Sequence, residues 1–97
     1  MDIENLIPAG EFCSSHRIEV SFINSLGEYG LIEIIELENT SYLHLNQLQK
    51  IEKYLRLYYD MDINIEGIEA ISHLLERMNE LESEIISLKN RLERYEV

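Results

Sequence analysis

The last third of this chain carries the pattern that most constrains its fold. From Ile71 to Tyr95 a series of apolar residues falls alternately three and four positions apart, as in the a and d positions of a heptad repeat. Charged and polar residues fill most of the positions between them, and no Gly or Pro follows Gly67. A helix over residues 64–95 would be about 48 Å long, which is more than a small domain can cover. We therefore expect it to pair with a second helix, through Ile71, Leu74, Met78, Leu81, Ile85, Leu88, Leu92 and Tyr95.

The heptad positions favour a homodimer. Isoleucine occupies two of the four a positions and leucine three of the four d positions, a combination typical of two-stranded coiled coils. The alternative is that the stripe packs on its own domain, which the length of the helix disfavours for its distal half. In a parallel pair the g and e residues would have opposite charges, but such pairs contribute only roughly a few tenths of a kcal/mol, so orientation and register stay open. These g residues are Arg77, Glu84 and Arg91, and the facing e residues are Glu82, Lys89 and Glu96.

Length and charge limit what this chain can contain and bind. With 97 residues it has room for one small domain besides the helix. We expect a domain over residues 1–62 and a dimerisation helix over residues 63–97. The formal net charge is −11, from 19 acidic and 8 basic residues. Such a chain is repelled by nucleic-acid phosphates and anionic lipids, so we expect neither as a partner; a basic protein surface suits it better.

The cysteine content and the first residues indicate a cytoplasmic protein. Cys13 is the single cysteine, so no intramolecular disulfide can form, which fits a reducing compartment. The N-terminus is acidic where a secretory signal is basic, and no apolar core follows it. No apolar run approaches the ~18 residues of a membrane span.

Two short helices with a tight connection are predicted near the N-terminus. Residues 1–8 lead into a helix over residues 9–15, which Pro8 can start and in which Phe12 and Cys13 face inward. A second helix covers residues 19–29, where apolar residues recur at near-helical spacing and Gly30 can cap the end. The connection between them is short enough for a helix-turn-helix.

A β-hairpin follows these helices. Residues 31–37 are rich in β-forming side chains, residues 38–40 have the composition of a turn, and residues 41–43 can return as a second strand. This pattern predicts the small wing of a winged helix.

The remaining segment before the long helix is predicted to be helical as well. Residues 45–59 carry an inward stripe, and Asn64 is a suitable N-cap for the long helix after a short link. The stripe consists of Leu48, Ile51, Leu55 and Tyr58. The expected fold class is therefore mostly α, with a small β component (α+β).

No group of residues has the spacing of a catalytic or metal site. Cys13 and His16 have C-x-x-H spacing, but a zinc site would need two further ligands. The pair also lacks the third, orienting group that an activated cysteine nucleophile uses. The many glutamates are dense enough along the helices to be a solvated face. We expect a protein that is not an enzyme, with no catalytic residue, cofactor or metal.

Charge also disfavours DNA binding. A winged helix reads DNA through basic or amide side chains on its second helix and through a basic wing. Between Ile18 and Gln49 the sequence has no Lys or Arg, and it carries Glu19, Glu28, Glu33, Glu36 and Glu38 instead. Ordinary DNA affinity depends on about six or more phosphate contacts, which such a surface would oppose.

The order of these segments resembles that of a known family. The run Glu11-Phe12-Cys13 is followed by the helix-turn-helix ending at residues 26–32, a short wing, a helix over residues 47–59 and the entry to the last helix at residues 60–71. Over residues 6–92 the chain resembles the chaperone-modulator family CbpM, a branch of the MerR-like winged-helix group. The most specific parts are the Glu-Phe-Cys run and residues 64–71.

This resemblance implies a fold and a function. The fold would be a MerR-like winged helix-turn-helix with a small β-hairpin wing and a long C-terminal coiled-coil helix. CbpM-like proteins bind the J-domain of a DnaJ-like co-chaperone, CbpA, and inhibit its work with the chaperone DnaK. Because J-domains dock on DnaK with a basic helix, an acidic protein that covers this helix would compete directly. MerR-like relatives that bind DNA have a basic second helix and an Arg/Tyr-rich wing, which this chain lacks, so a MerR-like transcriptional regulator is the alternative.

The candidate partner-binding residues are acidic positions around the wing, with one aromatic anchor. We expect the J-domain to contact Glu28, Tyr29, Glu33, Glu36 and Glu38, with Asp60 and Asp62 as second choices. Against this stands the interpretation that each is an ordinary solvated position. A third hypothesis is a structural adaptor that dimerises through its coil and has no affinity for a J-domain.

Overall fold

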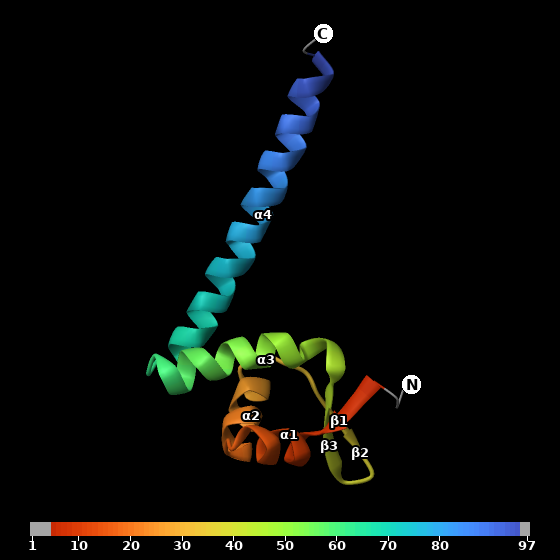
Figure 1. Ribbon diagram of the computed structural model, residues 1–97, viewed down its shortest axis with the longest axis vertical. Coiled ribbons are helices and arrows are strands. Elements are labelled where there is room, and N and C mark those ends of the chain that lie inside the picture. Colours follow the sequence, from red (N-terminus) through yellow and green to blue (C-terminus); the bar gives the residue numbers. More distant parts are fainter. Residues whose placement is uncertain (1–4, 96–97) are drawn as a thin grey trace.

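A small domain of short helices and strands carries one long helix that projects away from it (Figure 1). The computed structural model describes residues 5–95. The described residues are mostly helical, as predicted. In order, the elements are β1 (Leu6–Pro8), α1 (Ala9–His16), α2 (Val20–Glu28), β2 (Ile34–Leu37), β3 (Thr40–His44), the 3₁₀ turn η2 (Leu45–Gln47), α3 (Leu48–Leu55), the π-helical turn η3 (Arg56–Asp60) and α4 (Ile65–Tyr95).

Each of the two N-terminal helices is followed within two residues by a residue with a left-handed backbone. After α1, Arg17 has a φ of 55°, and the N–H of Ile18 donates to the carbonyl of Cys13 at 3.0 Å. After α2, Gly30 has a φ of 73°, which glycine adopts without steric cost, and a bond of 2.9 Å joins the N–H of Leu31 to the carbonyl of Leu26. The predicted helix-turn-helix and the cap at Gly30 are confirmed.

The sheet has three antiparallel strands in the order β1-β3-β2. Glu38 and Asn39 form the turn between β2 and β3, with φ angles of 48° and 63° that are typical of a two-residue type I′ turn. This hairpin is the predicted wing, although its first strand begins at Ile34 rather than at residue 31. Residues 6–8, expected only to lead into the first helix, pair with residues 42–44 of β3. That expectation was wrong because three residues are too few to show a strand pattern.

The segment predicted as one helix over residues 45–59 consists of η2, α3 and η3. In η3 the N–H of Met61 donates to the carbonyl of Arg56 at 3.2 Å, and this five-residue step makes the turn wider than an α-helical turn. Ile51 and Leu55 are buried as predicted. Tyr58, expected on the same inward stripe, is exposed instead, because the wider turn rotates the residues within it about the helix axis.

One apolar cluster holds the domain together. It receives side chains from α1, α2, β3, α3, the link before β2 and the first turns of α4. Phe12 and Cys13 face this core, as predicted. Its buried members are Ala9, Phe12, Cys13, Phe22, Ile23, Leu26, Leu31, Ile32, Leu43, Ile51, Tyr54, Leu55 and Ile68.

The first turns of α4 anchor the long helix on this core. Oδ1 of Asn64 accepts a hydrogen bond from the N–H of Gly67 at 2.8 Å, which is the predicted N-cap. Ile68 is fully buried, and the hydroxyls of Tyr54 and Ser72 lie 3.4 Å apart. Beyond these contacts α4 leaves the domain at one end of α3 (Figure 1).

Ile68→Ala is expected to lower the free energy of unfolding by about 2–5 kcal/mol. The substitution leaves a cavity where α4 meets the core, because Ile68 is fully buried. Ile86→Ala is the control, since Ile86 lies on the same helix but is 60% exposed; it should change the free energy by less than about 0.5 kcal/mol. Chemical denaturation followed by circular dichroism measures both. Equal losses in the two variants would contradict the anchoring role of Ile68.

Candidate functional site

Glu28 and Glu36 line one surface depression, although they come from different elements. Glu28 lies at the end of α2 and Glu36 on β2, and Asn24, Gly27 and Ile34 line the same depression. The two elements approach closely because Gly27 has no side chain: a Cβ there would lie 2.7 Å from Cδ1 of Ile34. We call Glu28 and Glu36 the acidic pair. Two exposed carboxylates at one depression favour a cationic group of a partner.

Glu33 and Glu38 belong to the wing but do not line this depression. The N–H of Glu33 donates to Oε1 of Gln47 at 2.7 Å, and its carbonyl accepts from Nε2 of Gln47 at 2.8 Å. These bonds fix the start of β2 on η2 and leave the carboxylate of Glu33 exposed. Glu38 is exposed at the hairpin turn. The predicted acidic residues of the wing therefore do not form one continuous cluster.

Tyr29 connects the end of α2 to the start of α4. Its hydroxyl donates to Oε1 of Glu66 at 2.7 Å, across 37 positions of sequence. The ring is partly exposed, so its predicted role as an aromatic anchor for a partner stays a prediction. The hydroxyl itself is already engaged within the chain.

This bond shifts the pKa values of both partners. The hydroxyl of Tyr29 stabilises the carboxylate and so holds the pKa of Glu66 below its ordinary value. The hydrogen bond to Glu66, followed by the negative charge of Glu66, raises the pKa of Tyr29. A carboxyl group whose pKa is lower in the folded state stabilises the fold above its unfolded pKa, and this stabilisation is lost as the pH falls through its folded pKa. A tyrosine whose pKa is higher in the folded state stabilises the fold below its unfolded pKa, and this stabilisation is lost as the pH rises through its folded pKa.

Tyr29→Phe is therefore expected to lower the midpoint of thermal unfolding only within a pH window. At neutral pH the bond is present in the unaltered protein and absent from the variant. The difference should shrink at pH values below the pKa of Glu66, where the bond loses its charged acceptor, and above the pKa of Tyr29, where the bond loses its donor. Thermal unfolding over a pH series measures it, with Glu66→Gln as a second variant that removes the charge. A difference that is constant across pH would assign the effect to packing of the ring.

Asp60 and Asp62 lie away from the acidic pair, at the elbow, which we define as residues 56–64 (η3 and the link to α4). Asp62 has a φ of 54°, and the next N–H, from Ile63, donates to the carbonyl of Leu57 at 3.0 Å. Asp62 lines a cavity with Tyr58, Tyr59, Ile63 and Asn64, whereas Asp60 lines a different one with Tyr59 and Arg56 among others. The predicted partner-binding residues thus lie at two places, the wing side and the elbow.

Three aromatic rings form a cluster at the elbow that the sequence did not indicate as a site. Phe22 of α2 is buried beneath two exposed tyrosines of η3, and its ring centroid lies 4.4 Å from that of Tyr58 and 5.6 Å from that of Tyr59. The two tyrosine rings lie 4.9 Å apart and nearly perpendicular, at 79°. The adjacent pair Tyr58-Tyr59 was the only local signal, and Phe22 joins it only through the fold.

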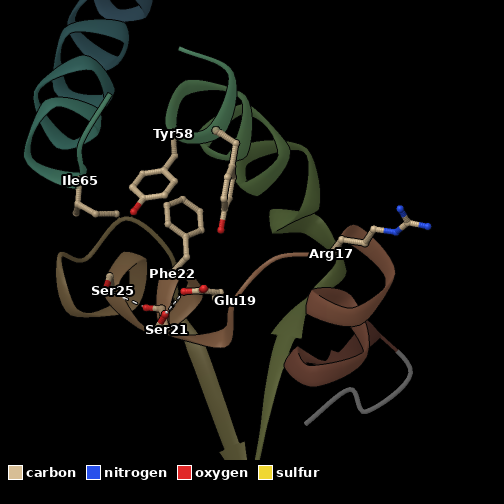
Figure 2. A pocket seen from close by; sticks show the side chains of 8 residues that line it. Arg17, Glu19, Ser21, Phe22, Ser25, Tyr58 and Ile65 are labelled. Carbon is tan, nitrogen blue, oxygen red and sulfur yellow. Dashed lines mark hydrogen bonds between the residues drawn. The ribbon is translucent and has the colours of Figure 1, made fainter. Parts of the chain in front are cut away.

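A cavity opens beside these rings at the start of α2 (Figure 2). Its polar side carries Glu19 and Ser21, whose hydroxyl donates to Oε2 of Glu19 at 3.2 Å. Ile65 of α4 lines the apolar side. Figure 2 shows that the guanidinium of Arg17, a further lining residue, points away from the rings. The lining near the rings therefore combines aromatic side chains, serine hydroxyls and the carboxylate of Glu19.

Cys13 and His16 are engaged in the fold. Burial raises the pKa of the Cys13 thiol, so the thiol stays neutral. His16 stacks on Phe12 with ring centroids 4.1 Å apart; its Nδ1 lies 3.1 Å from the Phe12 carbonyl oxygen and its Nε2 lies 3.7 Å from Oε1 of Glu52. Within residues 5–95 no three or more potential ligand side chains are close enough to hold a metal ion.

The basic side chains of the domain lie outside α2 and the wing. Lys50, Lys53 and Arg56 line a depression along α3, together with Glu52. The residues of α2 and of the β2–β3 hairpin include no Lys or Arg. The elements with which a winged helix contacts DNA therefore carry no cation among the residues that the structure describes.

The predicted dimerisation residues form an exposed stripe along α4. Leu74 near the domain is 64% exposed and Leu92 near the far end is 62% exposed. Ile71, the first residue of the stripe, is half-buried at the base of the helix. An apolar stripe of this length is unusual on a free surface, and pairing of α4 with another helix stays a prediction. Glu96, one of the predicted e positions, lies outside the described residues.

Comparison with known proteins relates the chain to one family. Residues 7–90 match the family model described as MerR HTH family regulatory protein. Neither the curated proteins nor the solved structures gave a match. Among the described residues, no helix is both long enough and apolar enough to cross a membrane.

Proposed function

The chain belongs to the MerR helix-turn-helix family of regulatory proteins, and from this premise we propose that it is a non-enzymatic chaperone modulator of the CbpM type. In this role it binds the J-domain of a DnaJ- or CbpA-like co-chaperone and restrains its activity with DnaK. The proposal combines the resemblance in the Glu-Phe-Cys run and residues 64–71 with the electrostatics of the domain.

The observation that carries this proposal is the charge of α2 and the wing. These elements keep the winged-helix arrangement but expose Glu28, Glu33, Glu36 and Glu38, with no Lys or Arg from residue 18 to residue 49. Their charge is opposite to that of a DNA-binding winged helix and complementary to a basic helix. Complementary charge speeds encounter and excludes wrong partners. A J-domain helix that docks on this surface would be unavailable to DnaK.

A homodimer forms the second part of the proposal. Pairing of α4 with a second copy would cover the exposed apolar stripe, and about 25 cal/mol per Å² of buried apolar surface would stabilise it. The dimer would present two acidic surfaces, one on each winged domain. One dimer would then hold two J-domains.

A MerR-like DNA-binding regulator is the second candidate, because the family model describes regulatory proteins. The acidic α2 and wing oppose it, since binding of DNA normally releases counterions through about six or more basic contacts. Under this alternative, a labelled DNA duplex at low salt should bind with an affinity that falls steeply as salt is added. Such binding, without affinity for a J-domain, would replace the first proposal.

Calorimetric titration with a J-domain protein of the same organism, at low and at high salt, tests the proposed function. We expect a Kd in the micromolar range or tighter that weakens as salt screens the charges. Inhibition of DnaK activity stimulated by the J-domain, measured in parallel, tests the modulator role. If the protein is a stable dimer and binds no J-domain at either salt concentration, the proposed function is wrong. The remaining hypotheses are then a structural adaptor and a DNA-binding regulator.

A further inference from the structure

Resting on the proposed function, we propose that the elbow binds one arginine or lysine side chain of the J-domain's basic helix. The cation would lie against the ring faces of Tyr58 and Tyr59, with the carboxylate of Asp62 as its counter-ion. This site is distinct from the acidic pair on the wing side.

The two tyrosines are exposed and yet packed against other aromatic rings. Their exposed fractions are 37% for Tyr58 and 45% for Tyr59, while buried Phe22 supports both rings from below. The tyrosine rings meet nearly edge to face, which is a favoured geometry for an aromatic pair. Both side chains belong to η3, a π-helical turn. Such turns are rare in proteins, but those that occur are frequently found at functional sites. Rigid aromatic side chains of this kind lose little conformational entropy when a partner binds.

The cavity on the α4 side of the elbow has the composition of a cation site. It is lined by Tyr58, Tyr59, Asp62, Ile63 and Asn64, and Asp62 is the one charged residue among these described residues. Oδ1 of Asn64 is already bonded to the N–H of Gly67, so the carboxylate of Asp62 is the strongest available acceptor. A cation over a tyrosine face contributes about 0.5–2 kcal/mol, and a neighbouring carboxylate adds to it.

The other tyrosines with described contacts differ from this pair. The hydroxyl of Tyr29 is bonded to Glu66, and Tyr54 is buried beside Ser72. Tyr58 and Tyr59, in contrast, contact only aromatic rings among the interactions found for residues 5–95, and their hydroxyls are free to bond a partner. The elbow is therefore better suited than Tyr29 to anchor a partner.

The chemistry of the site favours a cation over other occupants. A phosphate would meet Asp62, and a wholly apolar group would leave this carboxylate and two hydroxyls without partners. No arginine of the described residues lines this cavity. Arg17 and Arg56 line a different cavity with Tyr59 and Asp60, and the guanidinium of Arg17 points away from the rings (Figure 2). A competing occupant is the basic end of α4 from a second copy, which carries Lys89, Arg91 and Arg94.

Binding of the J-domain protein to full-length variants tests the proposal. Tyr58→Leu with Tyr59→Leu keeps apolar packing over Phe22 but removes the ring faces, so the Kd should rise at least about tenfold. Tyr58→Phe with Tyr59→Phe keeps the rings and should change the Kd less than about threefold. Asp62→Asn should raise the Kd in the same direction as the leucine pair, since asparagine also adopts a positive φ. Circular dichroism checks that each variant folds. If the variant with two leucines does not fold, the Asp62→Asn variant still tests the proposal.

The outcomes separate this proposal from the function on which it rests. If the unaltered protein does not bind the J-domain, both fail. If it binds and the leucine and Asp62→Asn variants bind equally well, the elbow site fails while the proposed function stands. If these variants lose dimerisation in light scattering but retain affinity for the J-domain, the occupant is α4 of a second copy and the proposal is overturned.

Discussion

A chain with Leu81→Glu and Ile85→Glu is expected to be monomeric at concentrations where the unaltered chain is expected to form the proposed dimer. Both residues are exposed in the single chain, at successive d and a positions in the middle of α4, and Glu is a good helix former. The substitutions therefore cost the free helix little. In a paired seam they would place two unpaired carboxylates from each chain in an apolar contact, where removal from water costs several kcal/mol for each ion. Sedimentation equilibrium or light scattering over a concentration series measures the change.

The control for this experiment adds the same charge elsewhere on α4. Ser83→Glu with Ile86→Glu lies on the same turns but outside the a and d positions, and both residues are exposed. This variant should remain dimeric. A dimer that survives the seam substitutions would contradict pairing through α4. Loss of the dimer in both variants would assign the effect to net charge rather than to the seam.

Glu28→Lys with Glu36→Lys is expected to weaken binding of the J-domain by about 100-fold or more at low salt. The acidic pair lines one depression, so the reversal places two cations where the proposed basic helix would dock. Both side chains are exposed, and the fold should tolerate the change. Calorimetry at two salt concentrations measures the loss, which should shrink as salt screens the repulsion. Affinity for DNA should not fall in the same variant, since the surface becomes more basic.

A matched charge reversal on α4 separates a local contact from net charge. Glu76→Lys with Glu93→Lys changes the net charge by the same amount at exposed positions outside the heptad seam. This variant should lose only a small, salt-sensitive part of the affinity, because distant charges are screened beyond about 10 Å at 0.1 M salt. Equal losses in the two variants would show that overall charge, rather than the acidic pair, carries the attraction. Unchanged binding after reversal of the acidic pair would remove the wing side as the docking surface.

Local patterns in the sequence determined most of the secondary structure. Helix caps and turns are short-range features, so Gly30 and Asn64 could each be recognised from a few neighbouring residues. The apolar stripe of α4 could be recognised from its repeat over residues 71–95, within a single helix. The charge of the wing and of the second helix was likewise evident, because it depends on composition alone. What the sequence established is therefore a winged helix-turn-helix of unusual acidity with an apolar stripe that extends beyond the domain.

Contacts between distant segments were decided only by the tertiary structure. Residues 6–8 form a strand because they pair with the edge of β3, and a segment of three residues is too short to show a strand pattern in the sequence. The π-helical turn exposes Tyr58 against the helical period, and Phe22, 36 positions earlier, supports its ring. The hydrogen bond between Tyr29 and Glu66 likewise forms only because the fold brings the end of α2 next to the start of α4. Such pairs arise from the packing of whole elements, whose free energy depends on the shape and burial of side chains far apart in sequence. The sequence thus determined most of the elements and their charge, and the packing decided β1, the π-helical turn and which side chains meet at the elbow.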